Sequence, residues 1–216
     1  MLSDLSFEVL DAYAVRYAAA PTLAFRLRVV SNRRLRFHSI ALKCQIRIEP
    51  QRRRYTAQEQ RELFSLFSDA SRWDDTLKPF LWTHVSTNVA GFEDETEFEL
   101  LVPCSYDLEV AAGKYFHHMR DGAAPLLFLF SGMVFAERPS GGLNVEPLSW
   151  DCEATYTLSG SIWSEMMDHY FPSQGWLLLE RGTLDELERF KAAQAAPTWD
   201  AALRGLLRHA GEGEAV

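Results

Sequence analysis

The sequence predicts an α+β fold: a mainly antiparallel β-sandwich with an inserted helix and a C-terminal helical layer. Three observations predict this fold. Apolar and polar residues alternate with period two over much of residues 3–158, as in half-buried strands. Helical patterns with capping residues follow after residue 160. Strands come first and helices last, which favours separate strand and helix layers over βαβ units.

The strand predictions rest on the alternation. Residues 5–17, 22–30, 39–49 and 95–102 each place apolar side chains on one face and polar side chains on the other. Residues 125–135 differ, because both alternating sets are apolar there. We therefore expect a strand that is covered on both faces, with the C-terminal helices as the cover.

A capping pattern locates the inserted helix. Thr56 and Glu59 have the spacing of a capping box, which opens a helix over residues 56–67 between two predicted strands. Because a cap contributes about 1 kcal/mol, this boundary is well defined by local sequence.

Three helices are expected after the strands. Ser161 can cap a helix over residues 162–171, and Thr183 begins a second capping box. Pro197 and Thr198 open the last helix.

We expect one domain over residues 1–216. It divides into a sandwich core at 3–158 that includes the helix at 56–67, C-terminal helices at 160–208, and a tail at 211–216. A chain of 216 residues buries roughly 70% of its unfolded surface, so it can fold without a metal or a disulfide. The composition, 47% hydrophobic and 24% charged, is that of a globular protein.

The expected compartment is the cytoplasm. The N-terminus lacks the basic and apolar stretches of a secretory signal, and the longest apolar run, at residues 125–135, is too short for a membrane span. Cys44, Cys104 and Cys152 are odd in number and far apart, which favours reduced thiols over a disulfide framework.

The charge is distributed unevenly. Residues 1–72 hold 13 Lys and Arg against 7 Asp and Glu, whereas the remainder holds 9 against 23, for a net charge of −8. The excess of negative charge disfavours nucleic acid as a partner, because phosphates would be repelled. A basic face on one side remains compatible with this total.

The sequence contains no pattern that identifies a catalytic site. A phosphate-binding glycine loop, a Gly-x-Ser-x-Gly elbow, a His-Glu-x-x-His helix and a Cys-x-x-Cys pair are all missing, so we predict no catalytic residue, metal or cofactor. His117 and His118 are adjacent, but neighbouring side chains on a strand point to opposite faces. We interpret them as surface histidines.

One candidate ligand pocket lies around an aromatic residue. On a strand, Trp82 and His84 would share a face and could form the rim of a pocket, with Lys78 supplying charge. The alternative is a tryptophan packed at the edge of a sheet beside a hydrogen-bonded histidine.

Basic residues form the candidate partner surface. On adjacent predicted strands the basic side chains would share the polar face, and a basic cluster precedes the inserted helix. If these strands neighbour the acidic ladder of Glu95, Glu97 and Glu99, cross-strand ion pairs explain both sets; otherwise the basic face is free for an acidic partner. The residues are Arg26, Arg28, Lys43, Arg47, Arg52, Arg53 and Arg54.

Several stretches resemble a bacterial protein family of unknown function. They are residues 41–50, 76–84, 106–111, 125–132 and 197–200, so the resemblance extends over nearly the whole chain. Members of this family are encoded beside uptake [NiFe]-hydrogenase genes, which implies an accessory role in the assembly or function of that enzyme. The family has no assigned catalytic residues.

Three functions are compatible with these observations. The first is a non-catalytic accessory protein that binds another polypeptide. The second is a small-ligand binder or enzyme with a pocket near Trp82 and His84. The third is a holdase similar to export chaperones, with an apolar groove between strands and helices. Homo-oligomerisation is left open.

Overall fold

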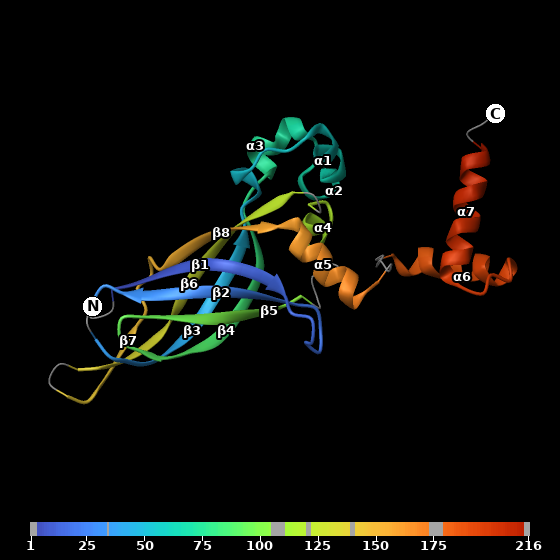
Figure 1. Cartoon of the computed structure of the whole chain (residues 1–216). Helices are drawn as coiled ribbons and strands as arrows, with labels where there is room; N and C mark the ends of the chain where they lie inside the picture. Colours follow the sequence, from blue (N-terminus) through green and yellow to red (C-terminus); the bar gives the residue numbers. More distant parts are fainter. Residues whose placement is uncertain are drawn as a thin grey trace. The chain divides into compact units, whose positions relative to one another are not determined.

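The computed structural model describes residues 4–33, 35–104, 111–119, 122–138, 141–172 and 179–213. The chain forms two compact units, Met1–Gly175 and Trp176–Val216 (Figure 1). The first contains the β-sandwich and helices α1 to α5, and the second contains α6 and α7. A single domain over residues 1–216 stays a prediction. Residues 106–110 of the resemblance and 214–216 of the predicted tail lie outside the described residues.

Two antiparallel sheets pack together, as the alternation predicted. The first sheet has the order β1-β2-β5, and the second has the order β4-β3-β6-β7 with β8 also paired to β6. All strand pairs are antiparallel. The strands are β1 (Leu5–Ala14), β2 (Thr22–Ser31), β3 (Phe37–Ile48), β4 (Phe80–Phe92), β5 (Glu95–Pro103), β6 (Ala123–Glu137), β7 (Leu143–Pro147) and β8 (Glu153–Ser159).

The inserted helical segment is interrupted, whereas one helix was predicted over residues 56–67. The Thr56–Glu59 capping box is confirmed, with both reciprocal bonds present. The first helix ends at Leu63, which leaves the helical conformation. The elements of this region are η1 (Pro50–Arg52), α1 (Ala57–Glu62), α2 (Phe64–Phe67), η2 (Ala70–Arg72) and α3 (Trp73–Thr76).

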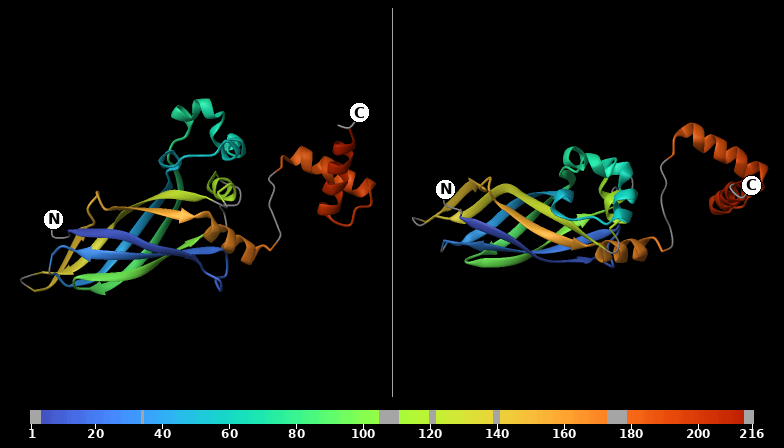
Figure 2. Two further views of the ribbon diagram at one scale, coloured as in Figure 1. Left: turned by 45° about the horizontal axis from the view of Figure 1, so that its top comes forward. Right: turned by 90° about the horizontal axis from the view of Figure 1, so that it is seen from above.

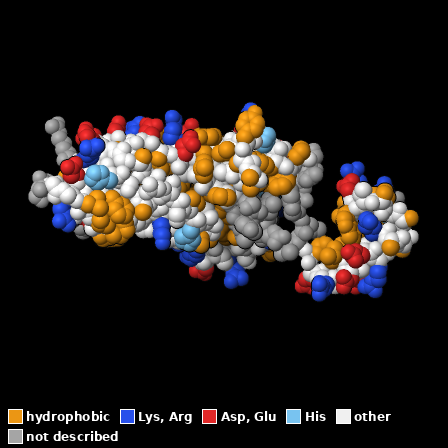
Figure 3. Space-filling model, turned by 90° about the horizontal axis from the view of Figure 1, so that it is seen from below, with side chains coloured by type: hydrophobic (Ala, Val, Ile, Leu, Met, Phe, Trp, Pro, Cys, Tyr) orange, Lys and Arg blue, Asp and Glu red, His pale blue; other side chains and the backbone are white. Residues whose placement is uncertain are grey.

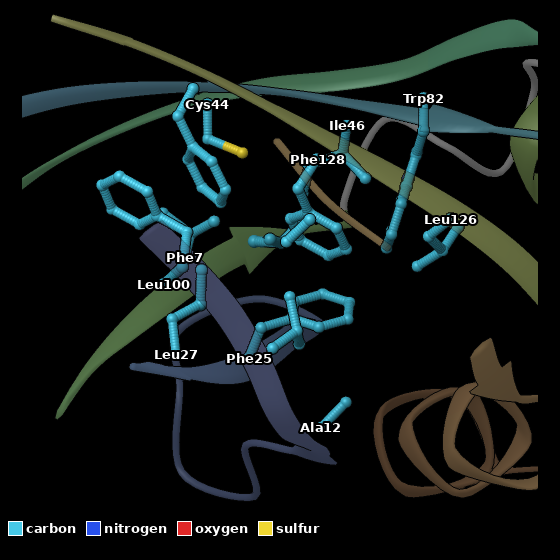
Figure 4. Close-up of a cluster of buried hydrophobic side chains, with 14 of the residues drawn as sticks. Phe7, Ala12, Phe25, Leu27, Cys44, Ile46, Trp82, Leu100, Leu126 and Phe128 are labelled. Carbon is cyan, nitrogen blue, oxygen red and sulfur yellow. The ribbon is translucent and has the colours of Figure 1, made fainter. Parts of the chain in front are cut away.

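Aromatic rings from both sheets fill the interior. Phe25 of β2 is fully buried and makes edge contacts with Phe128 and Tyr156 of the second sheet, with ring centroids 5.1 and 6.0 Å apart. Phe7 of β1 stacks on Phe130 of β6 at 4.4 Å. Figure 4 shows Phe7, Phe25 and Phe128 pointing into one shared core. Each such pair contributes about 0.5–1.5 kcal/mol beyond its buried area.

Helices close one end of the sandwich (Figure 2). They are α4 (Ala111–His117) and α5 (Gly160–Tyr170). Phe116 of α4 stacks on Trp163 of α5 at 4.6 Å and contacts Trp82 of β4 at 4.9 Å. All three side chains are buried, so this aromatic cluster seals the end of the core.

Helix α5 does not supply the cover predicted for residues 125–135. The inward side chains of β6 are buried, but Leu127 and Leu129 on its other face are half-buried, and Met133 is 39% exposed. Helix α5 packs on β1, β2 and β8 instead of β6. Within the first unit, one face of this strand lines the core, and the other face carries half-buried and exposed side chains.

Two of the three C-terminal boundaries differ from the prediction. Helix α5 begins one residue after Ser159, whose hydroxyl caps it in place of Ser161. Helix α6 (Arg181–Ala193) begins before Thr183, because Leu184 already donates its N–H to the carbonyl of Glu180. The capping-box prediction at Thr183 is therefore wrong.

The last helix agrees with its predicted start. In α7 (Trp199–Gly213), the Thr198 hydroxyl accepts the N–H of Ala201 at 3.1 Å. The helix extends past residue 211, where the tail was expected to begin. Within the described residues, no helix combines the length and apolarity that a bilayer crossing requires.

Replacing Gly132 should destabilise the sandwich. Gly132 of β6 has φ of +148°, and a Cβ there would lie 2.0 Å from the carbonyl oxygen of Ala41 on β3. We expect Gly132→Ala to lower the free energy of unfolding by about 2–4 kcal/mol, measured by urea denaturation. Gly205→Ala is the control, since a Cβ at Gly205 meets nothing within 4 Å. Equal stability of the Gly132 variant and wild type would contradict the close approach.

Candidate functional site

The outer face of the first sheet compensates its own charges. Arg28 lies 3.1 Å from Glu97 and 3.9 Å from Glu8, and Arg26 lies 3.8 Å from Asp11. The pairing register places Arg26 opposite Glu99 and Arg28 opposite Glu97 on β5. Figure 3 shows acidic and basic side chains next to one another along one border of the sandwich. Cross-strand ion pairs thus explain the two arginines and Glu97, and Glu99 accepts a hydrogen bond from the Tyr13 hydroxyl.

The predicted basic face is divided between the two sheets. Arg26 and Arg28 are on β2 in the first sheet, whereas Lys43 and Arg47 are on β3 in the second. These strands are consecutive in sequence but are not paired, so the prediction of one shared polar face is wrong. Among the described residues, neither Lys43 nor Arg47 forms an ion pair.

Arg47 lies among apolar side chains of the second sheet, whereas Lys43 lies between two serines. Arg47 is flanked by Leu81 of β4 and Leu127 of β6, and Lys43 by Ser86 and Ser131. The surrounding apolar side chains come from β6 and β7, and we call the whole set the second-sheet outer face. Its members are Lys43, Arg47, Leu81, Leu127, Leu129, Met133, Phe135, Leu143, Val145 and Pro147.

Sequence reasoning missed the apolar part of this face. Leu143 is 51% exposed, Val145 is 46% exposed and Leu81 is 47% exposed. The signal was the double apolar alternation of residues 125–135, which we assigned to burial under helices. Apolar side chains gathered on one exposed face are typical of interaction sites.

Arg53, one of the residues predicted to bind a partner, makes several contacts within the fold. Its guanidinium pairs with Glu59 of the capping box, donates to the carbonyl of Ala123 at 2.9 Å and lies 4.6 Å from the centre of the Tyr55 ring. The side chains of Arg53 and Glu59 are only 16% and 17% exposed. Arg53 thus fixes the inserted helical segment to the start of β6.

The neighbours of Arg53 are different. Arg52 Nε lies 2.6 Å from Oε2 of Glu49, a carboxylate that is 7% exposed, in a contact without hydrogen-bond geometry. Arg54 is exposed. A hollow of about 640 Å³ is lined by Arg52, Arg53 and Tyr156, among others. Since both lining guanidiniums already face carboxylates, this hollow offers little free positive charge to an anion.

The residues of the predicted ligand pocket do not share a face. The β3–β4 register shifts between Ile46 and Arg47, so Trp82 is the extra residue of a β-bulge. Trp82 is 6% exposed and packs in the core, whereas His84 and Lys78 are exposed. Lys78 donates to the carbonyl of Asp74 at 2.7 Å. Ligand binding by these three residues stays a prediction.

The adjacent histidines lie at the end of α4. His118 Nδ1 is 3.7 Å from Glu62 of α1, and the two imidazole rings are 5.4 Å apart. In the part of the chain that the structure describes, no three His, Cys, Asp or Glu side chains gather at metal-binding distance. Cys44 lies on the inward face of β3 as predicted, and burial raises its thiol pKa to about 12.

Arg53 should matter for stability because its removal leaves the Glu59 carboxylate without its cation. We expect Arg53→Met to lower the free energy of unfolding by roughly 2–4 kcal/mol, measured by urea denaturation. Arg54→Met is the matched control and should change it by less than about 0.5 kcal/mol. If Arg53→Met were as stable as the control, the structural role would be wrong.

Glu59 should make stability depend on pH. Burial would raise the pKa of this carboxyl, but the Thr56 N–H and the Arg53 guanidinium together hold it below its usual value. A depressed folded pKa stabilises the fold above the unfolded pKa of about 4.3, and this contribution is lost as pH falls through the folded pKa. We expect the urea midpoint of the wild-type protein to exceed that of Glu59→Gln at pH 7. The difference between the two midpoints should shrink on acidification. A constant difference would contradict it.

Comparisons with known proteins give a family but no function. No curated protein matches the chain. Among solved structures, the ApaA protein from Bordetella pertussis is 10% identical, with 73% of this chain and 94% of that chain covered and a TM-score of 0.27. A β-glucosidase from Kluyveromyces marxianus is 8% identical, with 72% of this chain but 15% of that chain covered and a TM-score of 0.25.

The family match is extensive. A family model described as a family of unknown function (DUF6084) matches residues 2–215. The chain therefore belongs to the DUF6084 family.

Proposed function

We propose that this protein is a non-catalytic accessory module that binds another polypeptide through the second-sheet outer face. The observation that carries the proposal is the pair of basic residues, Lys43 and Arg47, without an ion-pair partner among the described residues. They lie on the same face as Leu81, Leu127 and the exposed side chains of β7.

The chemistry of this face defines the occupant. The apolar side chains favour an apolar segment, and the two cations favour carboxylates beside that segment. Arg47 lies between two leucines, so its aliphatic stem can cover apolar surface while its guanidinium meets an acid. The other sheet supplies a contrast, because its arginines already face glutamates and aspartate.

We further propose that the partner belongs to the uptake [NiFe]-hydrogenase system. This finer assignment rests on the family resemblance drawn from the sequence. An export-chaperone-like holdase is the second candidate, favoured by the exposed fractions of Leu143 and Val145. A holdase would accept many unfolded chains, whereas an accessory module would select one partner.

Charge reversal tests the proposal. We expect Lys43→Glu/Arg47→Glu to weaken capture of the partner by about tenfold or more, because two attractive contacts become repulsive. The measurement is affinity purification of the tagged full chain from its native host, with quantitative mass spectrometry. Arg54→Glu/Arg208→Glu is the control, since both arginines are exposed and neither is a member of the second-sheet outer face.

The outcomes separate the parts of the proposal. Recovery of the wild-type protein alone, at every expression level, would contradict protein binding. Equal loss of partner in both double variants would contradict the assigned face. A selective partner that contains no hydrogenase subunit would contradict only the finer assignment, and broad suppression of aggregation of unrelated chains would favour the holdase.

A further inference from the structure

Strand β7 has an edge that the sandwich leaves uncovered. Strand β1 of the first sheet lies against β8 of the second, and β5 lies against β4, so these edges face a strand of the opposite sheet. In the described part of the chain, β7 pairs with β6 and has no comparable contact with the other sheet. The β6–β7 hairpin is at the end of the sandwich opposite the helices (Figure 2). An uncovered edge is a template for another strand.

The ladder shows which backbone groups of β7 are free. The N–H of Leu148 donates to the carbonyl of Gly132, and the N–H of Arg138 donates to the carbonyl of Gly142. The register of β6 and β7 between these two bonds has no shift. In an antiparallel ladder the bonded positions alternate, so the even-numbered residues of β7 face β6. The N–H and C=O groups of Leu143 and Val145 therefore point to the free edge.

The free edge has only part of the usual protection against pairing. Exposed edges are commonly protected by a short strand, by prolines, by lysines or by a bulge, and β7 has the first two of these features. Here the outward positions are Leu143, Val145 and Pro147, and the register of β7 with β6 is regular. Proline removes the N–H at position 147, so it limits pairing to Leu143 and Val145.

We propose that β7 pairs antiparallel with β7 of a second copy of this chain, forming a two-fold dimer. In this register Leu143 lies opposite Val145 of the second copy, which gives four backbone hydrogen bonds by symmetry. Pro147 lies opposite Gly141, whose N–H is already donated to Arg138 within the hairpin. The hydrogen-bonded pairing is thus limited to Leu143 and Val145 of each copy, whose backbone N–H and C=O groups are free.

Side chains of β7 are compatible with the same register. Its one charged residue, Glu146, lies opposite Gly142 of the second copy, so like charges do not meet. Asn144 lies on the two-fold axis at a non-hydrogen-bonded position, where side chains approach most closely. The Asn144 amide nitrogen is buried and has no hydrogen-bond partner within the described residues. Turning of the two amides toward each other would satisfy it.

The dimer has a defined strength and shape. Pairing of two five-residue strands buries less than the roughly 1,600 Å² of a standard interface, so we expect a dissociation constant in the micromolar range. The two-fold axis is perpendicular to the joined sheet, so both copies present the second-sheet outer face on the same side. This inference is independent of the proposed partner, because it concerns the purified protein alone.

Concentration-dependent association tests the dimer. We expect sedimentation equilibrium of the full chain to show a reversible monomer–dimer transition in the micromolar range. Val145→Pro should weaken it about tenfold or more, because it removes an edge N–H that β6 does not use. Val145→Thr keeps that N–H and should weaken the association much less than Val145→Pro does. A wild-type protein that stays monomeric throughout would overturn the proposal.

Cross-linking tests the register and does not depend on the proline variant. Asn144→Cys should form a disulfide-linked dimer on mild oxidation, since the two positions face each other on the axis. Glu146→Cys is the matched control, because its two copies would be about 13 Å apart. The native cysteines are buried and should not interfere. Equal cross-linking of both variants, or none in Asn144→Cys, would contradict the register.

Discussion

The structure depends on the packing of the two sheets against each other, with Phe25 at their contact. Its fully buried ring meets Trp82, Phe128 and Tyr156 of the opposite sheet. Because successive side chains of a strand alternate, each strand that supplies this core must turn its other set of side chains outward. The outer faces therefore carry side chains that do not take part in the core. The two outer faces differ in the residues that they present, and this difference suggests a function.

The two outer faces differ in whether their basic residues have carboxylate partners. On the first sheet, Arg28 has carboxylates on both neighbouring strands, so its charge is balanced within the fold. On the second, Arg47 has a leucine on each neighbouring strand. An unpaired cation within an apolar surface contributes little to folding, whereas it can contribute to recognition of an acidic and apolar segment. This asymmetry is the main reason to assign binding to the second sheet.

Part of the candidate site was predictable from sequence, and part was not. Alternation identified Lys43 and Arg47 as outward residues of a strand, because orientation along one strand is a local property. It could not show that Arg26 and Arg28 meet β5 while Lys43 and Arg47 meet β4 and β6, since strand order depends on contacts distant in sequence. The contacts of Arg53 could not be predicted for a related reason, because Glu59 and Ala123 are brought to it only by the fold.

The sequence by itself determined the positions of β1, β2, β3, β5 and β6, the Thr56–Glu59 cap and the start of the last helix, because alternation and capping act over a few residues. Only the tertiary structure decided that Trp82 enters the core and His84 does not, since a bulge shifts the parity of β4 by one residue. It also decided that α5 packs on β1, β2 and β8, and that β7 has a free edge within the sandwich. Those features depend on which elements pack together. A pattern of apolar residues along one strand does not show which other element, if any, packs on it.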